Sequence, residues 1–256
     1  MPRVDPILIF DLDGTILRRN SFPLWAIAVM TGRAQHLPAG RRLSISFRTG
    51  HLLVKRKLDR LGHNELFGNL QEAWSELTSG DSNGRMAANL QRRLLALARP
   101  ELRPIIQLVA ASSVDGLLAT AAAAEYADAL GRALGFRIVH ATEGEHTNSG
   151  ERKRDRILRY LEEQGWSDRP RIFFNDHMAD LPTMMISNAV CWFGSDQGLR
   201  RTRAALPGVR LIPCRGLTEQ KLSATLAHLV QSLTANQPAN TSSGSEPAPL
   251  RTSISL

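Results

Sequence analysis

The chain has 256 residues, of which 43% are apolar and 5% aromatic, and its formal net charge is +8 at pH 7. This length allows one large domain or two modest ones of about 100 to 200 residues each, with enough apolar residues for a sizeable core. The positive charge favours anionic partners, namely phosphorylated metabolites, nucleic acid or acidic lipid surfaces, without choosing among them.

Short, continuous apolar runs recur along the chain, and this pattern predicts parallel strands that are covered on both faces. In chain order the runs are PILIF, GLLAT, FRIVH, RIFFN, AVCWF and VRLIPC. Helical patterns separate them, and two of these patterns end in Gly135 and Gly165, as helices often do. The alternation predicts an α/β fold with a doubly wound parallel sheet.

A long stretch without a clear core strand interrupts this alternation from about Arg18 to Arg103. Its helical patterns are SFPLWAIAVM, HLLVKRKLDRLG, NELFGNLQEAWSEL and ANLQRRLLALA. We therefore predict a catalytic core of residues 1–18 and 104–235, a helical cap of residues 19–103 inserted after the first strand, and a disordered tail of residues 236–256, which is rich in Ser and Pro.

The longest apolar run, FPLWAIAVM, is far shorter than the ~20 residues that span a bilayer, so we expect no membrane span. Cys191 and Cys214 lie in apolar runs with no disulfide or metal-binding spacing. No signal peptide precedes the first acidic residues of the chain. Together these features predict a protein of the reducing cytoplasm.

Polar residues follow the predicted strands at the edge where ligands of open parallel sheets bind. In chain order they are Asp11, Asp13, Thr120, Lys153, Asp176 and Asp180. Each one alone also has a structural explanation: DG is a common turn signal, threonine is frequent in strands, exposed lysines are usually solvated, and aspartate often caps a helix.

The carboxylates form the most informative group, because several of them at one strand edge repel each other and resist burial. A hard divalent cation with oxygen ligands would compensate this charge, and Mg²⁺ fits that description. Lys153, in the first turn of a predicted helix, would add a second positive charge. The pattern therefore indicates a site that handles a metal ion and a phosphate group.

Four motifs together resemble the haloacid dehalogenase superfamily. They are FDLDGT at 10–15, LLATAA with Thr120, GERK with Lys153, and NDHMADLP at 175–182. They occur in the order typical of the family, and the resemblance covers about residues 7 to 215. Helices between the first and second motifs resemble the phosphoserine-phosphatase-like branch.

The resemblance implies a phosphatase with a role for each matching residue. Asp11 would form an aspartyl-phosphate, and Asp13 would act as general acid and then general base. The implied phosphoryl-binding groups are Thr120, Lys153 and the backbone N–H groups of Leu12 and Asp13. Mg²⁺ would lie between Asp11, the carbonyl of Asp13 and Asp176. Asp180 would either complete the metal shell or orient Lys153.

Three positions depart from the family pattern. Asn175 stands where glycine is common, and His177 stands where a small residue is usual, so His177 has either a packing role or a substrate contact. Asn20 is uncharged where phosphoserine phosphatases carry a glutamate that engages the substrate amine. This last difference argues against phosphoserine itself as the substrate.

Three functions remain open at this stage. The first is a Mg²⁺-dependent phosphatase acting on a small phosphate monoester, and the second is a phosphotransferase using the same intermediate. The third is a non-catalytic nucleic-acid-binding protein that uses the basic cap, although the cap lacks interleaved aromatics and any recognised binding motif. We therefore expect a small phosphorylated substrate and no nucleic acid. The cap charges are either a solvated helix face or, at Lys55 or Arg56, groups that close over the substrate.

Overall fold

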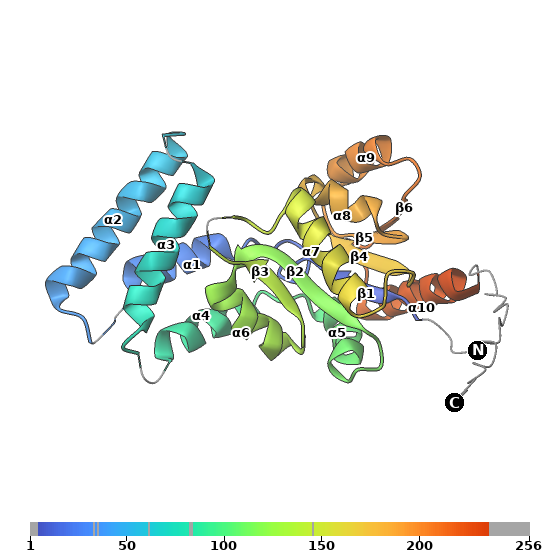
Figure 1. Cartoon of the computed structure of the whole chain (residues 1–256), viewed down its shortest axis with the longest axis horizontal. Helices are drawn as coiled ribbons and strands as arrows, with labels where there is room; N and C mark the ends of the chain where they lie inside the picture. The colour runs from blue at the N-terminus through green and yellow to red at the C-terminus, as the bar shows by residue number, and fades with distance from the viewer. Residues whose placement is uncertain are drawn as a thin grey trace, which may run out of the picture.

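The computed structural model describes residues 5–32, 34, 36–60, 62–81, 84–144 and 146–235. Six strands form one parallel sheet in the order β3-β2-β1-β4-β5-β6 (Figure 1). The strands are β1 (Ile7–Phe10), β2 (Gly116–Ala123), β3 (Val139–Thr142), β4 (Arg171–Asn175), β5 (Ala189–Trp192) and β6 (Arg210–Pro213). All six predicted runs contain strands, and the predicted doubly wound parallel fold is confirmed.

Helices cover both faces of the sheet, and alternate residues of β1 point to opposite faces. On one side, Leu8 and Phe10 belong to the core under α5 (Arg103–Ala110), α6 (Ala124–Leu134) and α10 (Glu219–Ala235). On the other side, Ile7 and Ile9 belong to the core under α7 (Gly150–Glu163), α8 (Leu181–Met185) and α9 (Asp196–Ala205). This double burial explains the continuous apolar pattern of the strands.

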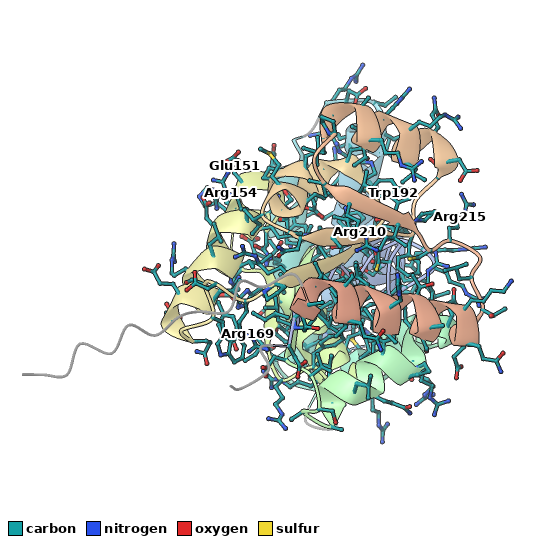
Figure 2. All side chains as sticks on the ribbon, turned by 90° about the vertical axis from the view of Figure 1, so that its right-hand side faces the viewer. Glu151, Arg154, Arg169, Trp192, Arg210 and Arg215 are labelled. Atoms are coloured by element: carbon teal, nitrogen blue, oxygen red, sulfur yellow. The ribbon has the colours of Figure 1, made fainter. Side chains whose placement is uncertain are left out.

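Two details of the sheet differ from the predicted pattern. Strand β2 continues to Ala123 although alanine favours helices by propensity, because Ala123 pairs with Thr142 of β3. Strand β6 lies at the sheet edge and is only partly buried, not covered on both faces. Figure 2 shows Arg210 of β6 near α10, where its guanidinium donates to the Ser232 hydroxyl at 2.8 Å.

The predicted insertion is helical. It contains α1 (Phe22–Thr31), α2 (Ala39–Lys57), α3 (His63–Thr78) and α4 (Arg85–Leu95), followed by a 3₁₀ turn at Pro100–Leu102. Figure 1 shows α1, α2 and α3 standing to one side of the sheet, with α2 outermost, while α4 packs beside α6. The division into cap and core, with its boundaries at 18 and 104, stays a prediction, and the predicted tail at 236–256 lies outside the described residues.

The segment that enters the insertion and the segment that leaves it are joined by backbone hydrogen bonds. The Arg18 N–H donates to the Leu97 carbonyl at 2.9 Å, and the Arg99 N–H donates to the Ile16 carbonyl at 2.8 Å. The Arg99 guanidinium also donates to the Gly14 carbonyl at 3.1 Å. The end of the insertion therefore holds the loop that follows β1. Over the described ranges, no helix has the length and apolarity needed to cross a membrane.

Candidate active site

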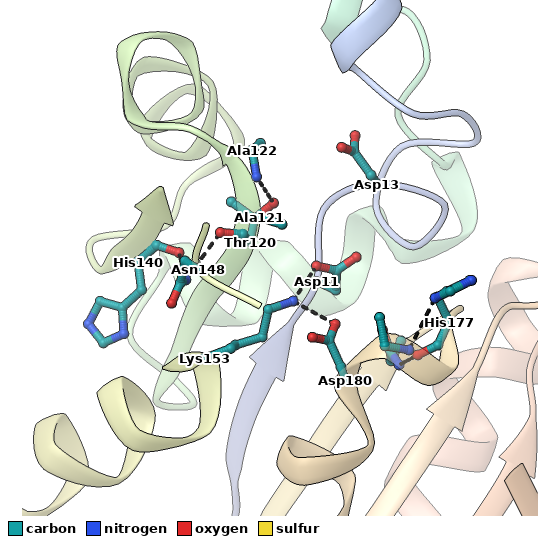
Figure 3. A network of polar contacts seen from close by, with 12 residues as sticks. Asp11, Asp13, Thr120, Ala121, Ala122, His140, Asn148, Lys153, His177 and Asp180 are labelled. Atoms are coloured by element: carbon teal, nitrogen blue, oxygen red, sulfur yellow. Dashed lines mark hydrogen bonds and ion pairs between the residues drawn. The ribbon is translucent and has the colours of Figure 1, made fainter. Parts of the chain in front are cut away.

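The tip of β1 carries a buried ion-pair cluster. Lys153 of α7 donates to Asp11 Oδ1 at 2.8 Å and to Asp180 Oδ2 at 2.6 Å, and all three side chains are nearly inaccessible to solvent (Figure 3). Burial alone lowers the pKa of Lys153, but the two carboxylates outweigh this effect and raise it. Lys153 is therefore a permanent cation between the two carboxylates.

Asp11 is the most perturbed carboxyl group of the cluster. Burial raises its pKa to about 7 against the lowering effect of Lys153, and the charges of Asp180 and Asp13 raise it further. One ammonium group thus compensates the surrounding carboxylates only in part. A further positive charge in the cavity would favour the ionised form of Asp11, which is the form that attacks an electrophile.

Asp13 points away from Lys153 and toward the insertion (Figure 3). Its Oδ1 accepts from the Ser21 N–H at 2.7 Å and its Oδ2 accepts from the Ser21 hydroxyl at 3.0 Å. The Ser21 hydroxyl lies 2.6 Å from the Tyr126 hydroxyl, and since it donates to Asp13, Tyr126 donates to it. Burial raises the pKa of Asp13 to about 6, although the bonds from Ser21 oppose the rise. A carboxyl group with this pKa can both give and accept a proton near neutral pH.

Asp176 follows β4 and lies against the loop after β1. A Cβ on Gly14 would come within 1.9 Å of Asp176 Oδ2, and Gly14 has a positive φ of 75°. Glycine is thus required for two reasons, the left-handed backbone and the close approach of the carboxylate. Burial raises the pKa of Asp176 as well.

Thr120 lies on β2 beside the cluster. Its Oγ1 accepts from the Ala122 N–H at 3.1 Å, which leaves the hydroxyl proton for an acceptor in the cavity. Asn148 supports this position, because its side-chain amide donates to the carbonyls of Thr120 and His140 at 3.1 and 2.8 Å. The side chain of Leu12 is fully buried, so only its backbone is a candidate for contact with a substrate.

These side chains line one cavity of about 450 Å³. Of the predicted residues, Asp11, Asp13, Thr120, Lys153, Asp176 and Asp180 all face it, and Leu12 does not. Its rim adds Arg18, Arg19, Asn20 and His177. Lys55 and Arg56, for which both a solvated helix face and closure over the substrate were open, do not line this cavity. They lie at the exposed end of α2 instead.

The residues that depart from the family pattern have local structural roles here. His177 Nδ1 accepts from the Ala179 N–H at 3.1 Å, so the imidazole caps the 3₁₀ turn at Met178–Asp180, and the residue also lines the cavity. Asn175 donates to the His177 carbonyl at 2.6 Å. Asn20 Oδ1 accepts from the Phe22 N–H at 2.8 Å, which leaves its amide group for an acceptor at the rim.

The donor set fits a Mg²⁺ ion. Within the described part of the chain, no three His, Cys, Asp or Glu side chains are arranged as a ready-made metal cage. Mg²⁺ is usually held by one or two carboxylates and keeps several waters, so a cage is not what it requires. Asp11 and Asp176 supply carboxylates with pKa values raised by burial, which is the charge excess that a cation relieves. Asp180 is already engaged, because it pairs with Lys153 and accepts from the Gly150 N–H at 3.4 Å.

The fold and the site define an α/β protein with an acidic centre at the ends of its parallel strands. A family model described as haloacid dehalogenase-like hydrolase matches residues 8–185. The chain belongs to the haloacid dehalogenase-like hydrolase family, as the motifs predicted. A comparison with curated protein sequences finds no match.

Solved structures share the fold at low sequence identity. A protein of unknown function from Bordetella pertussis Tohama I is 18% identical with a TM-score of 0.63, over 82% of this chain and 99% of that chain. A probable phosphoserine phosphatase from Vibrio cholerae is 12% identical with a TM-score of 0.57, over 90% and 68%. A phosphoserine phosphatase with bound substrate is 10% identical with a TM-score of 0.51, over 88% and 98%.

Proposed function

We propose that this protein is a Mg²⁺-dependent phosphatase that hydrolyses a small phosphate monoester through an aspartyl-phosphate on Asp11. The observation that carries the proposal is the buried Lys153, which joins Asp11 to Asp180 in the cavity that Asp13 also lines. Structural neighbours with phosphoserine phosphatase names support the reaction class.

The first step is attack of an Asp11 oxygen on phosphorus. Within the described residues, Lys153 engages Oδ1 and leaves Oδ2 as the nucleophile. The new P–O bond to Asp11 forms while the P–O bond to the leaving alcohol breaks, and Asp13 gives its proton to the leaving oxygen. Lys153, the Thr120 hydroxyl and the backbone N–H groups of the loop after β1 stabilise the charge on the phosphoryl oxygens.

The second step regenerates the enzyme. Asp13, now ionised, takes a proton from a water molecule as that water attacks phosphorus, and the P–O bond to Asp11 breaks. Inorganic phosphate leaves, and Asp13 again carries the proton. Mg²⁺ would be held by Asp11, the carbonyl of Asp13 and Asp176. When bound, it supplies positive charge that offsets the carboxylates and the phosphoryl oxygens.

The test is phosphate release from p-nitrophenyl phosphate and a panel of phosphorylated metabolites, with Mg²⁺ or with a chelator. We expect turnover that requires Mg²⁺ and is lost in Asp11→Asn. Measuring alcohol and phosphate together distinguishes hydrolysis from transfer, because transfer releases more alcohol than phosphate. Folded wild-type protein without turnover on any substrate would contradict the proposal.

Asp13→Asn tests the acid role separately. p-Nitrophenolate leaves without a proton, whereas an alkoxide needs one. We therefore expect kcat/KM, which reports the first step and not the hydrolysis of the intermediate, to fall about 10²-fold more on alkyl phosphates than on p-nitrophenyl phosphate. Equal losses on both substrates would show that Asp13 does not protonate the leaving group.

A further inference from the structure

An exposed apolar stripe runs along α2, the outermost helix of the insertion (Figure 1). Leu43, Phe47, Val54 and Leu58 are 58%, 76%, 57% and 57% exposed. Their spacing places them within an arc of about 60° around the helix axis. The opposite face carries Ile45 and Thr49, which are buried against the rest of the insertion. The stripe is therefore not the face by which α2 packs on its own protein.

Basic residues flank this stripe. The helix sequence AGRRLSISFRTGHLLVKRK carries six Arg and Lys and no Asp or Glu. Lys55 and Lys57 lie beside Val54 and Leu58 at the end of the helix and are exposed. Arg41 pairs with Glu76 of α3, so the far end is tied to the neighbouring helix. An apolar stripe with lysine and arginine beside it is typical of helices that lie in the plane of a membrane interface.

We propose that the stripe of α2 docks on an anionic lipid surface, a binding function separate from the proposed phosphatase reaction. Acyl chains accept the four apolar side chains while lipid phosphates accept the flanking cations, so a single partner satisfies both features. A second copy of the chain fits less well, because two α2 helices face to face would bring together basic flanks with no acidic residue of α2 to oppose them. Nucleic acid would satisfy the cations and leave the aliphatic side chains in water.

The test is vesicle flotation of the full-length protein with phosphatidylcholine alone and with a third of phosphatidylglycerol. We expect binding to the anionic vesicles that is at least tenfold tighter than to the neutral ones, and that weakens when salt rises from about 0.1 M to about 0.5 M. Lys55→Gln with Lys57→Gln should weaken binding about tenfold or more. Equal binding to both vesicle types, or none, would overturn the proposal.

Phe47→Ser tests the apolar part, with Leu108→Ser as the matched control, because Leu108 is an exposed apolar residue of α5. We expect about a tenfold loss or more for Phe47→Ser and none for Leu108→Ser, with unchanged thermal unfolding in both. Equal losses of vesicle binding in the two variants would show that α2 is not the binding surface. Light scattering without lipid and a gel shift with RNA complete the test. A dimer that Phe47→Ser dissociates, or RNA binding that replaces vesicle binding, would also overturn it.

Discussion

Lys153→Met is the substitution that most directly tests the interpretation of the buried cluster. Methionine keeps much of the side-chain volume but removes the charge from between Asp11 and Asp180, which lie 2.8 and 2.6 Å from the ammonium nitrogen. Leaving buried carboxylates without their partner typically costs about 3 to 5 kcal/mol. We expect a loss of up to this size in the free energy of unfolding near pH 8 without Mg²⁺.

The loss should shrink at low pH, and the sign follows from the pKa of Asp11. In the wild type this pKa is raised from 3.8 to about 7, so the folded state binds the proton more tightly than the unfolded state. The free energy of unfolding therefore falls as the pH rises from 3.8 to about 7. Lys153 lowers the pKa of Asp11, so in Lys153→Met this pKa is higher and the free energy of unfolding continues to fall at pH values above 7. Near pH 5 Asp11 is protonated with or without Lys153, and only the pair with Asp180 is lost.

Urea denaturation of wild type and Lys153→Met near pH 5 and near pH 8, with a chelator present, measures this difference. The expected result is a smaller destabilisation at the lower pH. A loss below about 1 kcal/mol at both pH values would mean that the cluster is solvated, as in a surface ion pair. An equal loss of several kcal/mol at both values would mean that the ionisation of Asp11 does not govern the loss, which would contradict its raised pKa.

Three further predictions concern the cation and the cavity rim. Burial raises the pKa values of Asp11 and Asp13 to about 7 and about 6, so the metal-free protein loses stability as pH rises from about 4 to 7. Mg²⁺ binds the ionised carboxylates and should therefore raise Tm more near pH 8 than near pH 5 in a thermal shift assay. Gly14→Ala should cost about 1 to 3 kcal/mol in urea denaturation and weaken Mg²⁺ binding in calorimetry, because the new Cβ displaces Asp176; unchanged Mg²⁺ affinity would refute the placement of Asp176. Arg19 lines the cavity and has no ion pair with any residue in the described ranges, so Arg19→Ala should raise KM about tenfold or more for phosphate esters with a second anionic group while sparing p-nitrophenyl phosphate. Equal KM changes for both ester types would place Arg19 outside the substrate contact.

Strands β1 to β5 could be predicted from the sequence because they are buried and carry continuous apolar runs, and the partly buried edge strand β6 carries such a run as well. The local sequence pattern does not show which segments pair in the sheet. The alanines after Thr120 favour a helix by propensity, yet pairing with β3 extends them. The start of α2 at Ala39 was also missed, because its first half contains Ser, Thr and Gly and is held by the packing of Ile45 and Thr49.

The candidate site was predictable where its residues end strands or begin helices, since the topology brings those positions to one edge. Its supporting residues follow no such rule. Ser21 meets Tyr126 across 105 residues of sequence, Asn148 meets Thr120 across 28, and Arg99 meets Gly14 across 85. No spacing or periodicity indicates contacts of this kind, because only the completed fold makes these residues neighbours.

Two carboxylates two residues apart at the end of a buried strand would repel each other if they shared one environment. The fold instead gives them different partners. Asp11 is held by Lys153 from the helix after β3, whereas Asp13 is held by Ser21, the residue that precedes α1 of the insertion. A displacement of Ser21 would therefore break both hydrogen bonds to the Asp13 carboxylate and leave the Lys153–Asp11 pair intact. Under the proposed mechanism, the proton donor and the nucleophile are thus held by different elements, the insertion for Asp13 and α7 for Asp11.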